Sequence, residues 1–164
     1  MKKMIRFLGG AMVLAAAVAA QAQVYVEGAY APLKIDDGSA SDKPAALMGV
    51  VGYEINPNVA IEGLLGLGVK KGSGGTNLSN SVGVFVKPKM MLNNEVEVFG
   101  RLGFARTKLK FSEDSSGSDS SFAYGLGGNY YLNKQTYLTA SYMSLYSKDG
   151  FKINGFNLGA GYKF

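Results

Sequence analysis

Apolar and polar side chains alternate with a period of two along most of the chain. In the segment 59–69 the odd positions are mainly aliphatic, while the even positions carry Glu62, Leu64 and small residues. The segment 156–164 alternates in the same way, with Phe, Leu, Ala, Tyr and Phe on one face. This pattern is typical of β-strands with one apolar face. After residue 22 no run of 18 apolar residues occurs, so no membrane-spanning helix is expected there.

Three short Asn-containing tripeptides separate pairs of alternating segments. They are Asn56-Pro57-Asn58, Asn93-Asn94-Glu95 and Asn133-Lys134-Gln135. Asn tolerates a positive φ and bonds nearby backbone groups, which suits tight hairpin turns. A three-residue turn predicts one cross-strand pair at each position: Ile55 with Val59, Leu92 with Val96 and Leu132 with Thr136.

Longer polar segments alternate with these turns, at 34–43, 70–78, 112–121 and 147–152. The segment 112–121 holds six Ser, one Gly and three acidic residues, and we expect it to be a loop. The pattern predicts an all-β chain of eight antiparallel strands, joined alternately by long loops and tight turns. The strands are expected near 24–33, 44–55, 59–69, 79–92, 96–111, 122–132, 136–146 and 153–164.

The first 22 residues have the features of a removable signal peptide rather than of a folded element. Lys2, Lys3 and Arg6 precede a short apolar run over 7–19, and Ala20-Gln21-Ala22 forms an A-x-A cleavage site. The alternative is a membrane-anchoring helix, but the apolar run is too short to cross about 30 Å of hydrocarbon. We therefore expect residues 1–22 to be removed and residues 23–164 to form one domain.

Composition restricts the chemistry that the chain can perform. It contains no Cys and no His, which excludes a disulfide scaffold, a Cys nucleophile and the commonest general base. We therefore expect no enzyme, no cofactor and no metal site. Two acidic groups, Asp36, Asp37 and Asp42, and Glu113, Asp114 and Asp119, lack the spacing of a calcium loop.

Net charge does not point to nucleic acid. Three of the 17 basic residues lie within the signal peptide, which leaves 14 against 12 acidic residues. No face of the predicted strands collects Lys and Arg between aromatic residues, so nucleic acid is not an expected partner.

Charged residues in the middle of the strands all lie on the face opposite the aliphatic side chains. They are Glu27, Glu54, Glu62, Lys87, Glu97 and Arg101. In a soluble barrel these charges would face water, whereas in a membrane barrel they would meet across a closed lumen. Such a lumen could be an ion path, or a structural ion network that plugs the barrel. The bulky Phe85, Phe99 and Tyr131 on the same face favour the plug.

Aromatic residues fall into two groups along the predicted strands. Tyr53, Tyr130, Tyr162 and Phe164 lie at the tight-turn end, and Phe104, Phe122, Tyr124, Tyr146 and Phe156 lie towards the long loops. Two such groups match the aromatic girdles at membrane interfaces. The alternative is the ordinary β-propensity of Tyr and Phe.

The chain resembles the small eight-stranded outer-membrane barrels of the OmpA/OmpX type over residues 23–164. The resemblance is carried by 24–30 (VYVEGAY), 52–58 (GYEINPN) and 158–164 (LGAGYKF). It implies an eight-stranded antiparallel up-and-down transmembrane β-barrel in the outer membrane, surrounded by lipid and lipopolysaccharide. It also implies that Leu158, Tyr162 and Phe164 form the signal for the barrel-assembly machinery.

The function predicted from this resemblance is structural or surface-exposed. We expect a role in membrane integrity or in adhesion to a surface ligand through the long loops. Arg106 and Lys108 continue the outward face beyond the membrane, where they could contact lipopolysaccharide phosphates. Two alternatives stay open: a narrow pore for small solutes or ions, and a soluble periplasmic carrier of the lipocalin type.

Overall fold

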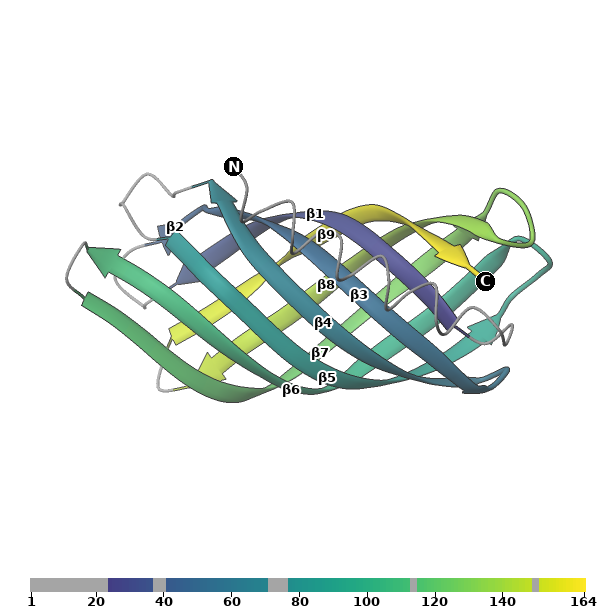
Figure 1. The fold of residues 1–164 in the computed structure, drawn as a ribbon, viewed down its shortest axis with the longest axis horizontal. Helices are drawn as coiled ribbons and strands as arrows, with labels where there is room; N and C mark the ends of the chain where they lie inside the picture. The colour runs from purple at the N-terminus through teal and green to yellow at the C-terminus, as the bar shows by residue number, and fades with distance from the viewer. Residues whose placement is uncertain (1–23, 37–40, 71–76, 113–114, 149–150) are drawn as a thin grey trace, which may run out of the picture.

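The computed structural model describes residues 24–36, 41–70, 77–112, 115–148 and 151–164. In these residues eight long strands and one two-residue strand form a single antiparallel sheet (Figure 1). The strands are β1 (Val24–Asp36), β2 (Ser41–Asp42), β3 (Ala45–Asn56), β4 (Val59–Lys70), β5 (Asn77–Met91), β6 (Val96–Ser112), β7 (Ser115–Tyr131), β8 (Thr136–Lys148) and β9 (Phe151–Lys163). This part of the chain holds no helix of the length and apolarity needed to cross a membrane.

Pairing between the first and last strands closes the sheet into a barrel. β1 pairs with β9 from Tyr25–Lys163 at one end to Asp36–Lys152 at the other, and every other long strand pairs with its neighbours in sequence. Closure removes the free edges, whose unpaired N–H and C=O groups could not be satisfied in lipid. The predicted eight-stranded up-and-down barrel is therefore confirmed.

Two of the three tight turns have the predicted pairing. The backbone N–H of Leu92 donates to the carbonyl oxygen of Val96 at 2.8 Å, and the backbone N–H of Leu132 donates to the carbonyl oxygen of Thr136 at 2.9 Å. Asn93 accepts the N–H groups of Glu95 and Val96 on its Oδ1, each at 2.8 Å. Asn133 performs the same role in the third turn. The Asn side chains thus complete both turns, as their sequence pattern indicated.

The first turn differs from the prediction. Asn56, not Ile55, pairs with Val59, and the register shifts between Glu54 and Asn56. Pro57 favours the first central position of a two-residue turn, and the N–H of Asn58 donates to Oδ1 of Asn56 at 2.9 Å. Ile55 becomes the extra residue of a β-bulge, so the predicted pair Ile55–Val59 is wrong.

The segment predicted as a loop at 112–121 is mostly strand. β6 ends at Ser112 and β7 begins at Ser115, so the two strands continue their pairing well beyond the alternating part of the sequence. Ladder hydrogen bonds are made by the backbone. A Ser-rich segment can therefore extend a strand wherever its neighbour supplies partners, without any apolar alternation.

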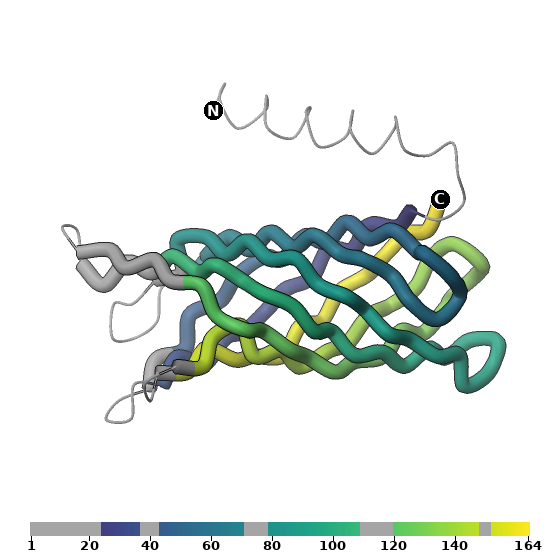
Figure 2. The backbone as a smooth tube through the Cα atoms, turned by 90° about the horizontal axis from the view of Figure 1, so that it is seen from below, coloured from purple at the N-terminus to yellow at the C-terminus, as the bar shows by residue number. Residues whose placement is uncertain are grey.

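The aliphatic side chains face outward and their neighbours in sequence face the lumen. Leu65, Val84 and Leu158 are 50%, 64% and 57% exposed, whereas Glu62 and Arg101 are buried. This orientation contradicts the soluble-carrier alternative, in which the apolar face would line the interior. Figure 2 shows the same barrel turned, with the tight turns at the end where the C-terminus lies.

Aromatic rings gather at both ends of the outer surface. Phe104 packs against Phe122 at a ring-centroid distance of 5.8 Å near the loop end, and Tyr162 packs against Phe164 at 5.2 Å near the turn end. Tyr146 was expected among the outward rings, and this is wrong. A bulge between Ser144 and Tyr146 inserts Leu145, which reverses the alternation. Tyr146 is therefore partly buried against the interior.

The half of the lumen nearer the long loops is filled by apolar side chains. This cluster contains small and large residues from all eight long strands. Its larger buried members are Leu33, Ile35, Met48, Val50, Leu64, Phe85, Met143, Leu145 and Ile153. The charges expected in the lumen therefore occupy only the half nearer the tight turns.

Candidate functional site

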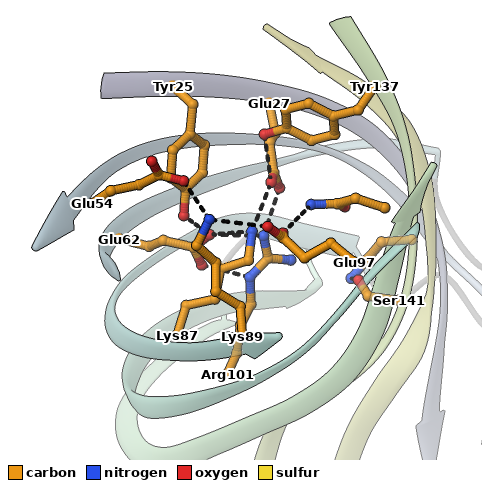
Figure 3. A network of polar contacts seen from close by, with 12 residues as sticks. Tyr25, Glu27, Glu54, Glu62, Lys87, Lys89, Glu97, Arg101, Tyr137 and Ser141 are labelled. Carbon is orange, nitrogen blue, oxygen red and sulfur yellow. Dashed lines mark hydrogen bonds and ion pairs between the residues drawn. The ribbon is translucent and has the colours of Figure 1, made fainter. Parts of the chain in front are cut away.

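All six charged residues that the sequence placed in the lumen are buried there. The structure divides them into two groups at different depths (Figure 3). Glu27, Glu62, Lys87 and Arg101 form the inner group, near the middle of the barrel. Glu54 and Glu97 belong to an outer group nearer the tight turns, together with two lysines described below.

Arg101 is the centre of the inner group. Its Nε and Nη2 donate to the two carboxylate oxygens of Glu62 at 2.5 Å and 3.0 Å, and Nη2 also donates to Glu27 at 2.5 Å. Lys87 contacts both carboxylates, with Nζ at 3.1 Å from Glu27 and 3.2 Å from Glu62. Each anion in this group therefore contacts two cations.

Aromatic side chains complete the inner group. The hydroxyl of Tyr25 donates to Glu62 at 2.6 Å, and that of Tyr137 donates to Glu27 at 2.9 Å. The ring of Phe99 lies 4.2 Å from Nζ of Lys87 and 4.7 Å from the guanidinium of Arg101. These contacts satisfy the carboxylate oxygens and provide cation–π partners for both cations.

The outer group includes two lysines that the sequence analysis did not single out. Lys89 contacts Glu54 and lies 2.9 Å from Glu97, and Lys163 contacts Glu54 from the last strand. Asn129 donates to Glu97 at 2.9 Å. Lys89 lies two positions after Lys87 in β5, and therefore on the same face of the strand, and Lys163 lies on the face of β9 opposite the aliphatic residues. The alternation of the sequence could therefore have placed both lysines in the lumen.

Both groups are electrically balanced. Each contains two carboxylates and two cations, so neither leaves a net charge inside the barrel. Removing a charge from water costs several kcal/mol, and a buried pair offsets that cost only when geometry and hydrogen bonding are good. The bidentate contact of Arg101 and the tyrosine hydroxyls meet this requirement, so the network can fill the lumen without an added ion.

Solvent reaches the outer group but not the space behind it. A cavity of about 610 Å³ opens at the tight-turn end, and its walls include Glu54, Lys89, Glu97 and Lys163. Between the two groups the side chains of Tyr25, Tyr131 and Tyr137 leave no volume in which a water-sized sphere can move. The open cavity is therefore a vestibule that ends at the ion network.

Arg106 and Lys108 project from the outer wall. Their cross-strand partners are Val82 and Asn80, and the four residues line a shallow groove of about 310 Å³ near the loop end. Leu158 and Tyr162 also face outward on β9, while Phe164 is half-buried.

The acidic segments do not form a common site in the part of the chain that the structure describes. Asp36 lies at the end of β1 with its carboxylate 3.0 Å from Nζ of Lys34, Asp42 lies in β2 and Asp119 in β7. Asp37, Glu113 and Asp114, and the expected signal peptide at 1–22, lie outside the described residues.

Comparison with solved structures shows several small outer-membrane barrels. Ail, the attachment invasion locus protein of Yersinia pestis, is 25% identical with a TM-score of 0.68, covering 88% of this chain and 99% of Ail. Ail in complex with the heparin analogue sucrose octasulfate is 23% identical with a TM-score of 0.66, covering 87% and 98%. Neisserial surface protein A is 20% identical with a TM-score of 0.68, covering 86% and 97%.

A further structural neighbour is OprG from Pseudomonas aeruginosa, 15% identical with a TM-score of 0.59, covering 88% of this chain and 97% of OprG. No curated protein sequence matches the chain. The family model for the outer membrane protein beta-barrel domain matches residues 6–164. Together with the closed barrel and its apolar exterior, this match shows that the chain belongs to the outer membrane beta-barrel family and lies in the outer membrane.

Proposed function

We propose that this protein is a sealed outer-membrane barrel that acts at the cell surface, in membrane integrity and adhesion, and not as an enzyme or a pore. The observation that carries the proposal is the filled lumen. An ion entering from the vestibule meets two balanced ionic groups and then the apolar cluster around Phe85 and Leu64. An apolar constriction holds back ions because it offers no groups to replace their hydration shell.

Planar-bilayer conductance tests this proposal against the narrow-pore alternative. The purified protein should give no steady single-channel current. Arg101→Ala should also stay silent, because the apolar cluster on the loop side is untouched by that change. Arg106→Ala, which alters only the outer wall, is the matched control. Steady wild-type currents that Arg101→Ala abolishes would establish the pore and overturn the sealed barrel.

We propose that the loop end carries the surface-ligand contact. Lys34, Lys43, Lys70 and Lys152 are exposed at this end of the barrel. Cations so placed attract polyanions, and the structural neighbour Ail is complexed with a heparin analogue. Retention of the detergent-solubilised protein on immobilised heparin should therefore fall when these lysines are changed to Gln. Unchanged retention would contradict a polyanionic ligand at this end.

We also propose that Arg106 and Lys108 contact lipopolysaccharide phosphates. Both side chains are exposed on the outer wall, just beyond the aromatic pair Phe104–Phe122. A charge-assisted bond from guanidinium or ammonium to phosphate is strong and directional. The variant Arg106→Gln/Lys108→Gln should unfold at a lower denaturant concentration only in vesicles that contain lipopolysaccharide. An equal effect in phospholipid vesicles would contradict this contact.

Finally, we propose that Leu158, Tyr162 and Phe164 contact the barrel-assembly machinery. Leu158 and Tyr162 lie on the outer face of β9, and the ring of Tyr162 packs on that of Phe164. Phe164→Ser should lower the assembled fraction in cells while export continues, as measured by surface labelling and fractionation. Asn157→Ser, which changes the inner face of the same strand, provides a control. Normal surface levels for Phe164→Ser would remove the role of this residue.

A further inference from the structure

The outer wall of the barrel carries a groove in the region that faces hydrocarbon. The groove has a volume of about 620 Å³ and runs over β5, β6 and β7. This volume lies within the range of about 300–1,000 Å³ that is typical of ligand sites. The outward-facing residues that line it are all apolar: Pro88, Met90, Val98, Gly100, Leu102 and Leu126.

The groove results from a proline and a glycine that face each other on neighbouring strands. Pro88 interrupts the pairing of β5 with β6, which resumes at Lys89–Phe99, because a proline has no N–H to donate. Gly100 lies across from Pro88 and contributes no side chain. A Cβ at Gly100 would lie 3.7 Å from Cγ of Pro88 and 3.8 Å from Cδ2 of Leu126. The floor of the groove is therefore backbone, and side chains form its sides.

The exposure of the side chains shows that the centre of the groove is recessed. Val98 and Gly100 point outward and are only half-buried, whereas Leu102 and Leu126 beside them are 50% and 73% exposed. A molecule in the groove is therefore contacted from the floor and from both sides. In lipid, where no apolar surface is removed from water, van der Waals contact with small residues is a main cause of association.

The groove lies between the two aromatic groups of the outer surface. On β6, Gly100 is midway between Val96, which pairs with Tyr130 of the turn-end group, and Phe104 of the loop-end group. The groove extends to Met90, at the turn end of β5. Short turns face the periplasm in outer-membrane barrels, so the groove reaches into the periplasmic leaflet, which consists of phospholipid.

We propose that this groove holds one acyl chain of a phospholipid from the periplasmic leaflet. The groove is continuous with the lipid-facing surface of the barrel, so hydrocarbon chains are what it meets in the membrane. An acyl chain is apolar and flexible, and can follow the recess between Pro88 and Leu126. A second copy of the barrel fits less well, because its convex and rigid wall would rest on the projecting Leu126 before it reached Gly100.

Native mass spectrometry of the whole protein tests the proposal, after reconstitution in nanodiscs of phosphatidylethanolamine with added lipopolysaccharide. The unchanged protein should retain one phosphatidylethanolamine per barrel. Gly100→Leu, whose side chain would occupy the groove, should lose it. Gly63→Leu is the matched control and should keep the lipid, because Gly63 faces outward on β4 and a Cβ there meets nothing within 4 Å.

A smaller substitution separates loss of the lipid from loss of folding. The Cβ of Gly100→Ala would make only ordinary van der Waals contacts, so this variant should keep the compact band of the unboiled protein on a gel. It should retain less phosphatidylethanolamine than the unchanged protein, and it decides the question if Gly100→Leu does not assemble.

Four outcomes would overturn the proposal. The first two are no retained lipid in the unchanged protein, and equal retention of phosphatidylethanolamine by the unchanged protein and the Gly100 variants. Retention of lipopolysaccharide in place of phosphatidylethanolamine would assign the groove to the other leaflet. A dimer that Gly100→Leu abolishes would show that a second copy of the chain occupies the groove.

Discussion

At the scale of single residues, the side-chain orientation along each strand determines what a substitution costs. Leu65 faces outward near the middle of β4 and is 50% exposed, so it contacts hydrocarbon in a membrane. Glu62, three positions earlier, faces the opposite way and binds Arg101. A charged side chain is therefore tolerated at position 62, which faces the lumen, and destabilises the barrel at position 65, which faces the hydrocarbon.

Leu65→Arg should lower the free energy of unfolding by about 2–4 kcal/mol, the cost of an arginine near the bilayer midplane. Val69→Arg, on the same face of the same strand near its loop end, is the matched control and should cost only about 0–1 kcal/mol. Urea titration of the protein in lipid vesicles measures both values. Equal effects at the two positions would show that the membrane depth assigned to β4 is wrong.

At the scale of strands, ionic contacts across the lumen tie the closing seam to the rest of the barrel. Glu27 lies on β1, one of the two seam strands, and contacts Arg101 on β6, Lys87 on β5 and Tyr137 on β8. Lys163 on β9, the other seam strand, contacts Glu54 on β3. These contacts supplement the β1–β9 ladder, so losing them should weaken the seam first.

Glu27→Gln should raise amide hydrogen exchange along the β1–β9 seam by about tenfold or more, since breaking a buried ion pair costs about 3–5 kcal/mol. Hydrogen exchange read by mass spectrometry in nanodiscs measures the change. Glu97→Gln is the matched control, because Glu97 contacts Lys89 on β5 and Asn129 on β7, away from the seam. If both variants accelerate the seam equally, Glu27 has no special part in closure.

Several departures from the sequence-based prediction also belong to the scale of strands. Alternation placed Glu27, Glu62 and Arg101 on the inner face correctly, since side-chain parity is a local property of a strand. The predicted pairing failed at Ile55 and the alternation failed at Tyr146, because in each case a bulge shifts the register and a bulge depends on the partner strand. The alternation also failed along 115–121, where pairing with β6 continues β7 through a sequence without apolar residues.

At the scale of the whole molecule, closure and the filled lumen should make the barrel resistant to detergent. The unboiled protein should migrate as a compact band on a denaturing gel and shift on boiling. Arg101→Met should lower the temperature at which the compact band is lost, because Glu27 and Glu62 would each lose a cation. Lys134→Met, in an exposed tight turn, should leave that temperature unchanged. A wild-type band that does not change on heating would contradict a stable closed barrel.

The sequence by itself determined the eight strands, the two tight turns around Asn93 and Asn133, and the face on which each charge lies, because these depend on neighbours in the chain. Only the tertiary structure decided which charges pair, how Tyr25 and Tyr137 bond to them, and that apolar residues fill the loop half of the lumen. These contacts join residues as far apart as Glu27 and Tyr137, 110 positions along the chain. They depend on strand register and barrel closure, which side-chain alternation alone does not specify.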